Sequence, residues 1–165
     1  MTKIVIALTY LAISSPLLVP TVNAKDLAGW IEPVVVYPNG INFNAKLDTG
    51  AANSSLNTPR IEQFTKNSED YVRFDVKSRE GNAHTLELPM IKNVTIKRHF
   101  GKSQTRPVVS LKICLGNKIK EVPVNLVDRT GFNYQLLLGR SFLSPDTLVD
   151  SSKQNLTQPQ CVTGK

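Results

Sequence analysis

The strongest constraint on the fold is a series of short segments in which apolar and polar side chains alternate, with turn residues between them. In residues 41–47, for example, Ile41, Phe43, Ala45 and Leu47 occupy one face and polar residues the other. A period of two is that of a half-buried strand. The segments with strand character are 30–37, 41–47, 71–78, 84–90, 94–98, 106–114 and 119–127. Their number and spacing predict a single all-β domain, either a barrel or a sandwich.

Helical signals are weak by comparison. Ile61–Phe64 could form a single helical turn, and Ser144–Thr147 could be a short turn or the start of a helix. No amphipathic helix of three turns precedes the C-terminal segment. The last ten residues carry no pattern and are expected to form a loose tail.

Residues 1–24 have the pattern of a secretory signal peptide. Lys3 precedes a mostly apolar run, and Val22-Asn23-Ala24 offers small residues where a signal peptidase cleaves. A membrane anchor is the alternative, but it needs about 20 uninterrupted apolar residues, and Pro16 and Pro20 interrupt this run. We therefore expect an exported protein, periplasmic or secreted, with no stable membrane insertion after cleavage. The domain would then span residues 25–156, followed by a tail of residues 157–165.

Charge and cysteine content narrow the possibilities further. The formal net charge of +7 favours contact with anionic surfaces, although a solvated basic surface is the simpler interpretation. No basic run interleaved with aromatic residues indicates nucleic-acid binding. Cys114 and Cys161 are the only cysteines. In an exported chain they could form a disulfide, or Cys114 could be a small buried apolar residue.

The stretch most suggestive of chemistry is Asp48-Thr49-Gly50-Ala51, which directly follows the alternating segment 41–47. Gly50 permits a sharp turn and a close approach of another backbone, and the Thr49 hydroxyl can form a local hydrogen bond. A carboxylate held at such a turn is suited to orienting a water molecule. A second apolar segment, Leu136–Leu143, follows much later in the chain and contains Gly139-Arg140.

Together these two segments resemble the hallmarks of the retropepsin-like aspartic proteases. The chain is most similar to a bacterial family in that fold that carries the labels "ATP-dependent zinc protease" and retropepsin-like endopeptidase. The resemblance covers residues 29–156 and rests on Gly29-Trp30, Ala45–Ala51, Val72-Arg73-Phe74, Arg106–Val109 and Leu137–Arg140. It implies a closed retropepsin-like β-barrel and an aspartic endopeptidase that acts on a peptide or protein substrate.

The resemblance also assigns roles. Asp48 would be the catalytic carboxylate, Thr49, Gly50 and Ala51 would form the active-site turn, and Leu138, Gly139 and Arg140 would support it from beneath. Peptide hydrolysis of this type needs two carboxylates that share one proton. Because Asp128-Arg129-Thr130-Gly131 breaks the motif spacing, the second carboxylate would come from the Asp48 of a second subunit in a homodimer.

Two details differ from the viral relatives or stay open. The viral enzymes pair this arginine with an acidic residue four positions after the aspartate, and Ala52 stands there in this chain. Arg140 therefore needs another acceptor, either a backbone carbonyl or Glu62. A flap over the substrate could be formed by Arg79–Asn82 or by Arg98–Gln104, with Phe100 and Gly101 at the tip of the second hairpin.

Other chemistries lack their motifs. The sequence contains no His-Glu-x-x-His pattern, no cysteine cluster with ligand spacing and no phosphate-binding glycine loop. We therefore expect no metal and no cofactor, whatever the family label says. The alternative to the protease is a non-catalytic binding or structural module of the same fold in the periplasm.

Overall fold

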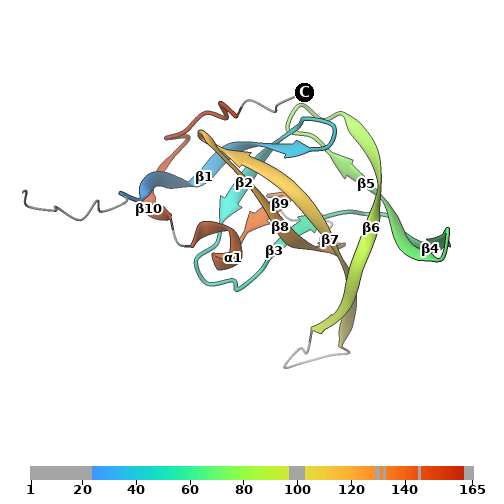
Figure 1. Cartoon of the computed structure of the whole chain (residues 1–165). Coiled ribbons are helices and arrows are strands. Elements are labelled where there is room, and N and C mark those ends of the chain that lie inside the picture. The colour runs from blue at the N-terminus through green and yellow to red at the C-terminus, as the bar shows by residue number, and fades with distance from the viewer. Residues whose placement is uncertain (1–23, 97–102, 129–130, 132, 145, 162–165) are drawn as a thin grey trace, which may run out of the picture.

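The computed structural model describes residues 24–96, 103–128, 131, 133–144 and 146–161. In this part of the chain the fold is almost entirely β, which confirms the predicted class (Figure 1). The elements are β1 (Asp26–Tyr37), β2 (Ile41–Leu47), β3 (Ser54–Asn57), β4 (Ile61–Lys66), β5 (Glu69–Lys77), β6 (Ala83–Ile96), β7 (Gln104–Leu115), β8 (Lys118–Val127), β9 (Leu136–Leu138), α1 (Arg140–Leu143) and β10 (Thr147–Gln154).

Six of these strands close into a barrel. The strand order runs β1-β2-β9-β3-β8-β7, and β7 also pairs with β1, so the ring has no free edge. The short strand β9 lies between β2, to which it is parallel, and β3, to which it is antiparallel. It therefore lies beside the end of β2, where the Asp48 turn begins.

Alternation along the strands fills the barrel. Phe43, Ala45 and Leu47 of β2 are almost fully buried, whereas Asn44 between them is exposed. The β1–β2 hairpin pairs Val34 with Phe43. Burying each large apolar side chain contributes about 1.5–3 kcal/mol to stability. A shift of β2 by one residue would expose these side chains, so the core fixes the register of β2 and the position of its last residue, Leu47.

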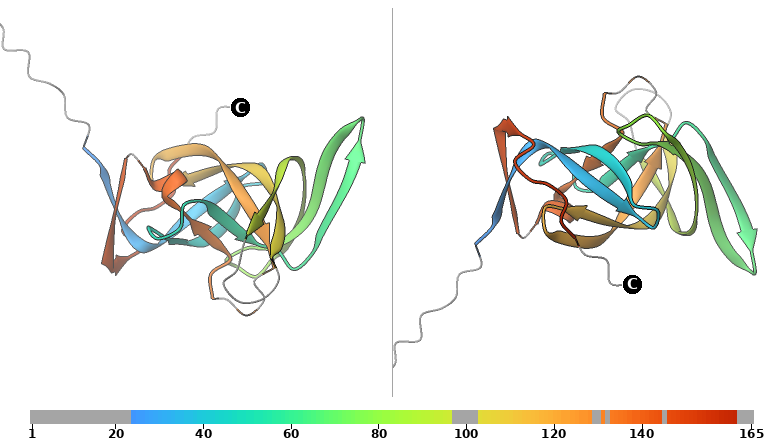
Figure 2. Two further views of the ribbon diagram at one scale, coloured as in Figure 1. Left: turned by 90° about the horizontal axis from the view of Figure 1, so that it is seen from below. Right: turned by 90° about the horizontal axis from the view of Figure 1, so that it is seen from above.

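Beyond the barrel, the sheet continues from β7 through β6 and β5 to β4. Figure 2 shows the β4–β5 hairpin standing well away from the barrel. Its two strands are joined at Asn67 and Ser68, both with positive φ, which is typical of a tight hairpin turn. The prediction of a helical turn at Ile61–Phe64 is wrong: these residues lie in β4 and pair with β5. Residues 61–66 are mostly polar and have no apolar face at helical spacing. Their pairing with β5 therefore determines their structure.

The C-terminal segment is also more ordered than expected. The prediction that a helix starts within Ser144–Thr147 is wrong: the helix α1 already ends at Leu143, and Thr147 begins β10, which runs parallel to β1. At Gly29 the two strands approach so closely that a Cβ atom would lie 2.5 Å from the carbonyl oxygen of Lys153. Only glycine fits there without a shift of the backbone.

After β10, residues 155–161 are fastened to the barrel by a buried carboxylate and a disulfide. The carboxylate of Glu32 accepts hydrogen bonds from the backbone N–H groups of Gly29, Leu156 and Thr157, and from the Thr157 hydroxyl. Glu32 is fully buried. The disulfide joins Cys161 to Cys114 of β7. The expectation of a loose tail is therefore wrong for its described part.

In the part of the chain that the structure describes, no helix has the length and apolar character needed to cross a membrane.

Candidate active site

The candidate site is the turn that leaves the end of β2. Leu47 is the last residue of that strand and is paired with Leu138 of β9, and the Asp48 N–H donates to the Leu138 carbonyl at 2.8 Å. The core therefore fixes the backbone of Asp48 directly, because the paired residues Leu47 and Leu138 are both buried. Asp48 itself is partly exposed, and Thr49 and Gly50 are exposed.

Backbone N–H groups hold the Asp48 carboxylate. Its Oδ1 atom accepts hydrogen bonds from the N–H groups of Gly50 and Ala51, both at 3.1 Å. Among the described residues, its Oδ2 atom has no hydrogen-bond partner. One oxygen is thus fixed to the turn, and the other is available to a water molecule or to a second carboxylate.

Gly139 brings a second segment against this turn. The Gly139 N–H donates to the Ser54 hydroxyl at 3.2 Å. A Cβ atom on Gly139 would lie 2.6 Å from the carbonyl carbon and oxygen of Asn53 and 3.0 Å from the carbonyl oxygen of Ala51. Any larger residue would push this segment away from the turn.

The next residues extend the contact along the loop. The N–H of Arg140 donates to the Ala51 carbonyl at 2.9 Å, and the N–H of Ser141 donates to the Ala52 carbonyl at 3.0 Å. These bonds satisfy backbone groups at the start of α1 and at the same time fix the loop between Asp48 and β3.

The Arg140 side chain completes the support. Its Nη1 atom donates to the carbonyl oxygens of Thr49 at 3.0 Å and of Gly50 at 2.8 Å. The sequence left two possible acceptors for Arg140, a backbone carbonyl or Glu62. In the structure the acceptors are backbone carbonyls. Glu62 lies instead in β4 and contacts Arg60 and Arg73.

The two flap candidates lie in different positions. Phe100 and Gly101 lie outside the described residues, and the described pairing of β6 with β7 ends at Ile96 and Gln104. The other candidate, Arg79–Asn82, is tied to β2: the Arg79 N–H donates to the Asn42 carbonyl, and Asn42 contacts Glu80. Asn42 is separated from Asp48 by six residues of extended strand, about 20 Å. The Arg79–Asn82 turn is therefore fixed at the opposite end of β2 from Asp48.

Two residues that matter here were not identified from the sequence. Ser54 positions Gly139, but a serine at the start of a strand gives no signal of its own. Glu32 could have been identified, because it is a lone carboxylate within the apolar run of β1. A carboxylate in a buried strand needs hydrogen-bond donors from other parts of the chain.

In the described residues, no group of three or more His, Cys, Asp or Glu side chains is arranged to hold a metal ion. Within one described chain, the candidate site consists of one carboxylate, the backbone donors that hold it and one arginine.

Comparison with known proteins gives the family. The family model described as "Retropepsin-like aspartic endopeptidase RimB" matches residues 27–160. The chain belongs to this RimB-like family. The match includes the Asp48 turn, β9 and α1, so the two segments that meet at the candidate site both lie inside the RimB-like region.

A solved structure supports the same conclusion about the fold. The crystal structure of protein Lpg0085 from Legionella pneumophila, described as having unknown function, superposes with a TM-score of 0.70 at 33% identity. The match covers 83% of this chain and all of that one.

Curated relatives carry a different name. Proteins named probable alpha-L-glutamate ligase from Shewanella pealeana and Desulfotalea psychrophila are 32% and 28% identical to this chain over 114 and 115 residues. These matches cover 67% and 68% of this chain but only 25% of each relative. The RimB-like chain thus spans about a quarter of the length of the curated relatives it matches.

Proposed function

We propose that this chain is an aspartic endopeptidase in which two subunits each contribute Asp48 to one catalytic pair. The observation that carries the proposal is the state of the Asp48 carboxylate: backbone donors hold one oxygen, while the other is without a partner in the described chain. The turn that carries it is exposed in the single chain. A second copy can therefore approach it along a two-fold axis.

The chemistry follows from two carboxylates that share one proton. Like charges so close cannot both ionise, so one carboxyl keeps its proton while the other is a carboxylate. The carboxylate takes a proton from a water molecule as the water oxygen attacks the peptide carbonyl carbon, and the protonated partner donates to the carbonyl oxygen. Proton transfer to the amide nitrogen then lets the carbon–nitrogen bond break.

Arg140 and Gly139 act on this chemistry through the turn. The Arg140 side chain donates hydrogen bonds to the Thr49 and Gly50 carbonyls. It thereby fixes the backbone of the turn, whose N–H groups hold the Asp48 carboxylate. Positioning of this kind matters because small displacements of a catalytic group cost large factors in rate.

We further propose that the protein works outside the cytoplasm as a periplasmic or secreted enzyme after loss of residues 1–24. The Cys114–Cys161 disulfide supports this location, because disulfides persist mainly in oxidising compartments.

The name of the relatives supplies a substrate class to test. Peptides rich in glutamate are anionic. Loss of residues 1–24, which include Lys3, changes the formal net charge of the chain from +7 to +6, and this positive charge would favour their encounter. We therefore propose acidic peptides as the first substrates to compare with neutral ones.

The experiment compares cleavage of an unfolded protein and of acidic peptides by wild type, Asp48→Asn and Asp128→Asn. Asp128 is the matched control, because it begins the second, imperfect Asp-x-Thr-Gly sequence. We expect loss of cleavage in Asp48→Asn only. Retention of cleavage by Asp48→Asn would overturn the assignment.

One observation favours a second candidate, a non-catalytic module. Arg140 binds carbonyls of its own chain, so it makes no contact that requires a second subunit. A folded wild type that stays monomeric at all working concentrations, with and without peptide, and cleaves nothing would support this alternative.

A further inference from the structure

The outer edge of β4 is a second surface of interest. β4 ends the strand order, and no described strand pairs with its outer side. All of its residues are exposed or half-exposed. Such an edge presents unpaired N–H and C=O groups that can pair with another strand. Figure 2 shows that the hairpin projects away from the barrel, so the approach to this edge is open.

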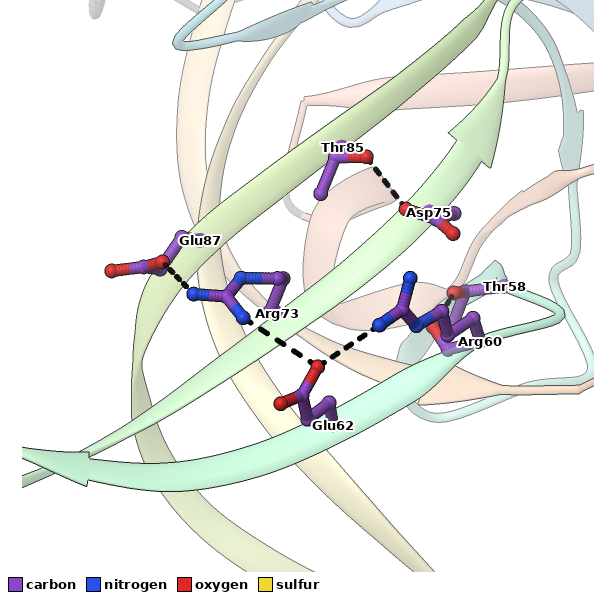
Figure 3. A network of polar contacts seen from close by, with 7 residues as sticks. All are labelled: Thr58, Arg60, Glu62, Arg73, Asp75, Thr85 and Glu87. Atoms are coloured by element: carbon purple, nitrogen blue, oxygen red, sulfur yellow. Dashed lines mark hydrogen bonds and ion pairs between the residues drawn. The ribbon is translucent and has the colours of Figure 1, made fainter.

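One face of this hairpin carries a ladder of charges. Glu62 is opposite Arg73 in β5, which is opposite Glu87 in β6. Figure 3 shows Arg73 between the two carboxylates, with Arg60 also directed at Glu62. Lys66 contacts Glu87 at 2.9 Å.

Phe64 lies between the two charged residues of β4 on the same face. Alternation places Glu62, Phe64 and Lys66 together on one side. Phe64 contacts the Tyr71 ring at a centroid distance of 6.0 Å, and the Arg73 guanidinium lies over the Phe64 ring at 5.0 Å. The edge strand thus presents an aromatic ring flanked by a negative and a positive side chain.

We propose that β4 pairs antiparallel with β4 of a second copy of this chain, with the two-fold axis at Phe64. This register places Glu62 opposite the partner's Lys66 and Lys66 opposite the partner's Glu62. Phe64 faces the partner's Phe64. Directly opposed charges and aromatic pairs stabilise neighbouring strands, and the two sheets merge into one.

Charge complementarity selects a second copy and this register. A parallel, in-register pairing would put Glu62 against the partner's Glu62 and Lys66 against the partner's Lys66, and like charges directly opposite are destabilising. A slip by one residue places Lys66 opposite the partner's Ile61 and loses both ion pairs. The strand is complementary to itself, as an isologous two-fold contact requires.

This contact is separate from the pairing proposed for Asp48. β4 is at one end of the strand order, while Asp48 leaves β2 within the barrel. The β4 contact therefore leaves the Asp48 turn exposed. A chain that uses both two-fold contacts assembles beyond a dimer.

The test is sedimentation of wild type, Glu62→Lys, Lys66→Glu and an equimolar mixture of the two variants over a wide concentration range. Each single variant opposes like charges in a self-pair, so we expect association at least about tenfold weaker than wild type. In the mixture, Lys at position 62 of one chain meets Glu at position 66 of the other, so association returns to the wild-type level. No substrate is present, and the result is independent of cleavage.

The matched controls are Glu121→Lys and Lys112→Glu, the same charge reversals in an exposed pair on β8 and β7. Both should sediment like wild type, and circular dichroism confirms that every variant is folded. Either of two results overturns the proposal: equal sedimentation of wild type and the β4 variants, or failure of the mixture to recover association. Equal weakening by the controls would show a net-charge effect and would also overturn it.

Discussion

Replacing Glu32 by glutamine tests how the C-terminal segment is fastened to the barrel. The Glu32 carboxylate is fully buried and accepts four hydrogen bonds, of which the two at Oε1 come from Gly29 and Leu156 and the two at Oε2 from Thr157. A glutamine keeps one oxygen but places an NH₂ group where the other oxygen was. The two N–H or O–H groups that donated to the lost oxygen then face the NH₂ group, which is itself a donor.

The magnitude follows from these contacts. A hydrogen bond to a charged acceptor is worth about 1.5–3 kcal/mol, so losing two of them costs roughly 3–6 kcal/mol. Removing a buried charge offsets part of this cost. We expect Glu32→Gln to lower the free energy of unfolding by about 3 kcal/mol, a large fraction of the 5–15 kcal/mol typical of a domain.

The assay is urea unfolding followed by tryptophan fluorescence, with Glu121→Gln as the control. Glu121 is exposed and its ion pair with Lys112 is at the surface, so its replacement should cost less than about 1 kcal/mol. Thr157→Val removes one of the four hydrogen bonds and should fall between the two. If Glu32→Gln unfolds within about 0.5 kcal/mol of wild type, the carboxylate does not hold this segment and the reasoning fails.

Three further perturbations address other parts of the structure. Gly139→Ala should cost about 1–3 kcal/mol in stability and abolish cleavage, because its Cβ atom would lie 2.6 Å from the Asn53 carbonyl; wild-type stability and activity would contradict this. Cys161→Ser should lower stability by about 3–4 kcal/mol, and reductant should destabilise wild type but not the variant; an equal response of both would refute the role of the disulfide. Burial alone would raise the pKa of Asp146, but the hydrogen bond from Lys120 lowers it on balance from its ordinary value of 3.8. A carboxyl with a lowered pKa stabilises the fold at pH values above 3.8, and this contribution is lost as the pH falls through the folded pKa. Asp146→Asn should therefore cost on the order of 1 kcal/mol at pH 7 and progressively less as the pH falls below 3.8; a cost that does not change with pH would contradict this.

The barrel strands could be predicted because their sequence pattern and their burial agree. Alternation in β2 marks which side chains enter the core, and the turn after Leu47 follows from where that alternation ends. The contact between Gly139 and the Asp48 turn was implied by the resemblance alone. The alternation pattern does not predict that β9 pairs between β2 and β3, because β9 has only three residues.

The remaining features depend on partners that are distant in the sequence. β4 is a strand because β5 pairs with it, and its own residues carry neither a strong helical nor a strong strand preference. The C-terminal segment is ordered because Glu32 and Cys114 hold it. A search by local pattern misses such order, and the one available signal, a lone glutamate in an apolar strand, was not used.

In the proposed enzyme, each active site uses Asp48 from two subunits. Mixing wild type with Asp48→Asn at a constant total concentration, allowing time for subunit exchange, and measuring peptide cleavage tests this most directly. If only pairs of wild-type subunits are active, an equimolar mixture contains about a quarter active dimers. Activity should then fall with the square of the wild-type fraction. A linear fall, as for independent monomers, would contradict the shared site.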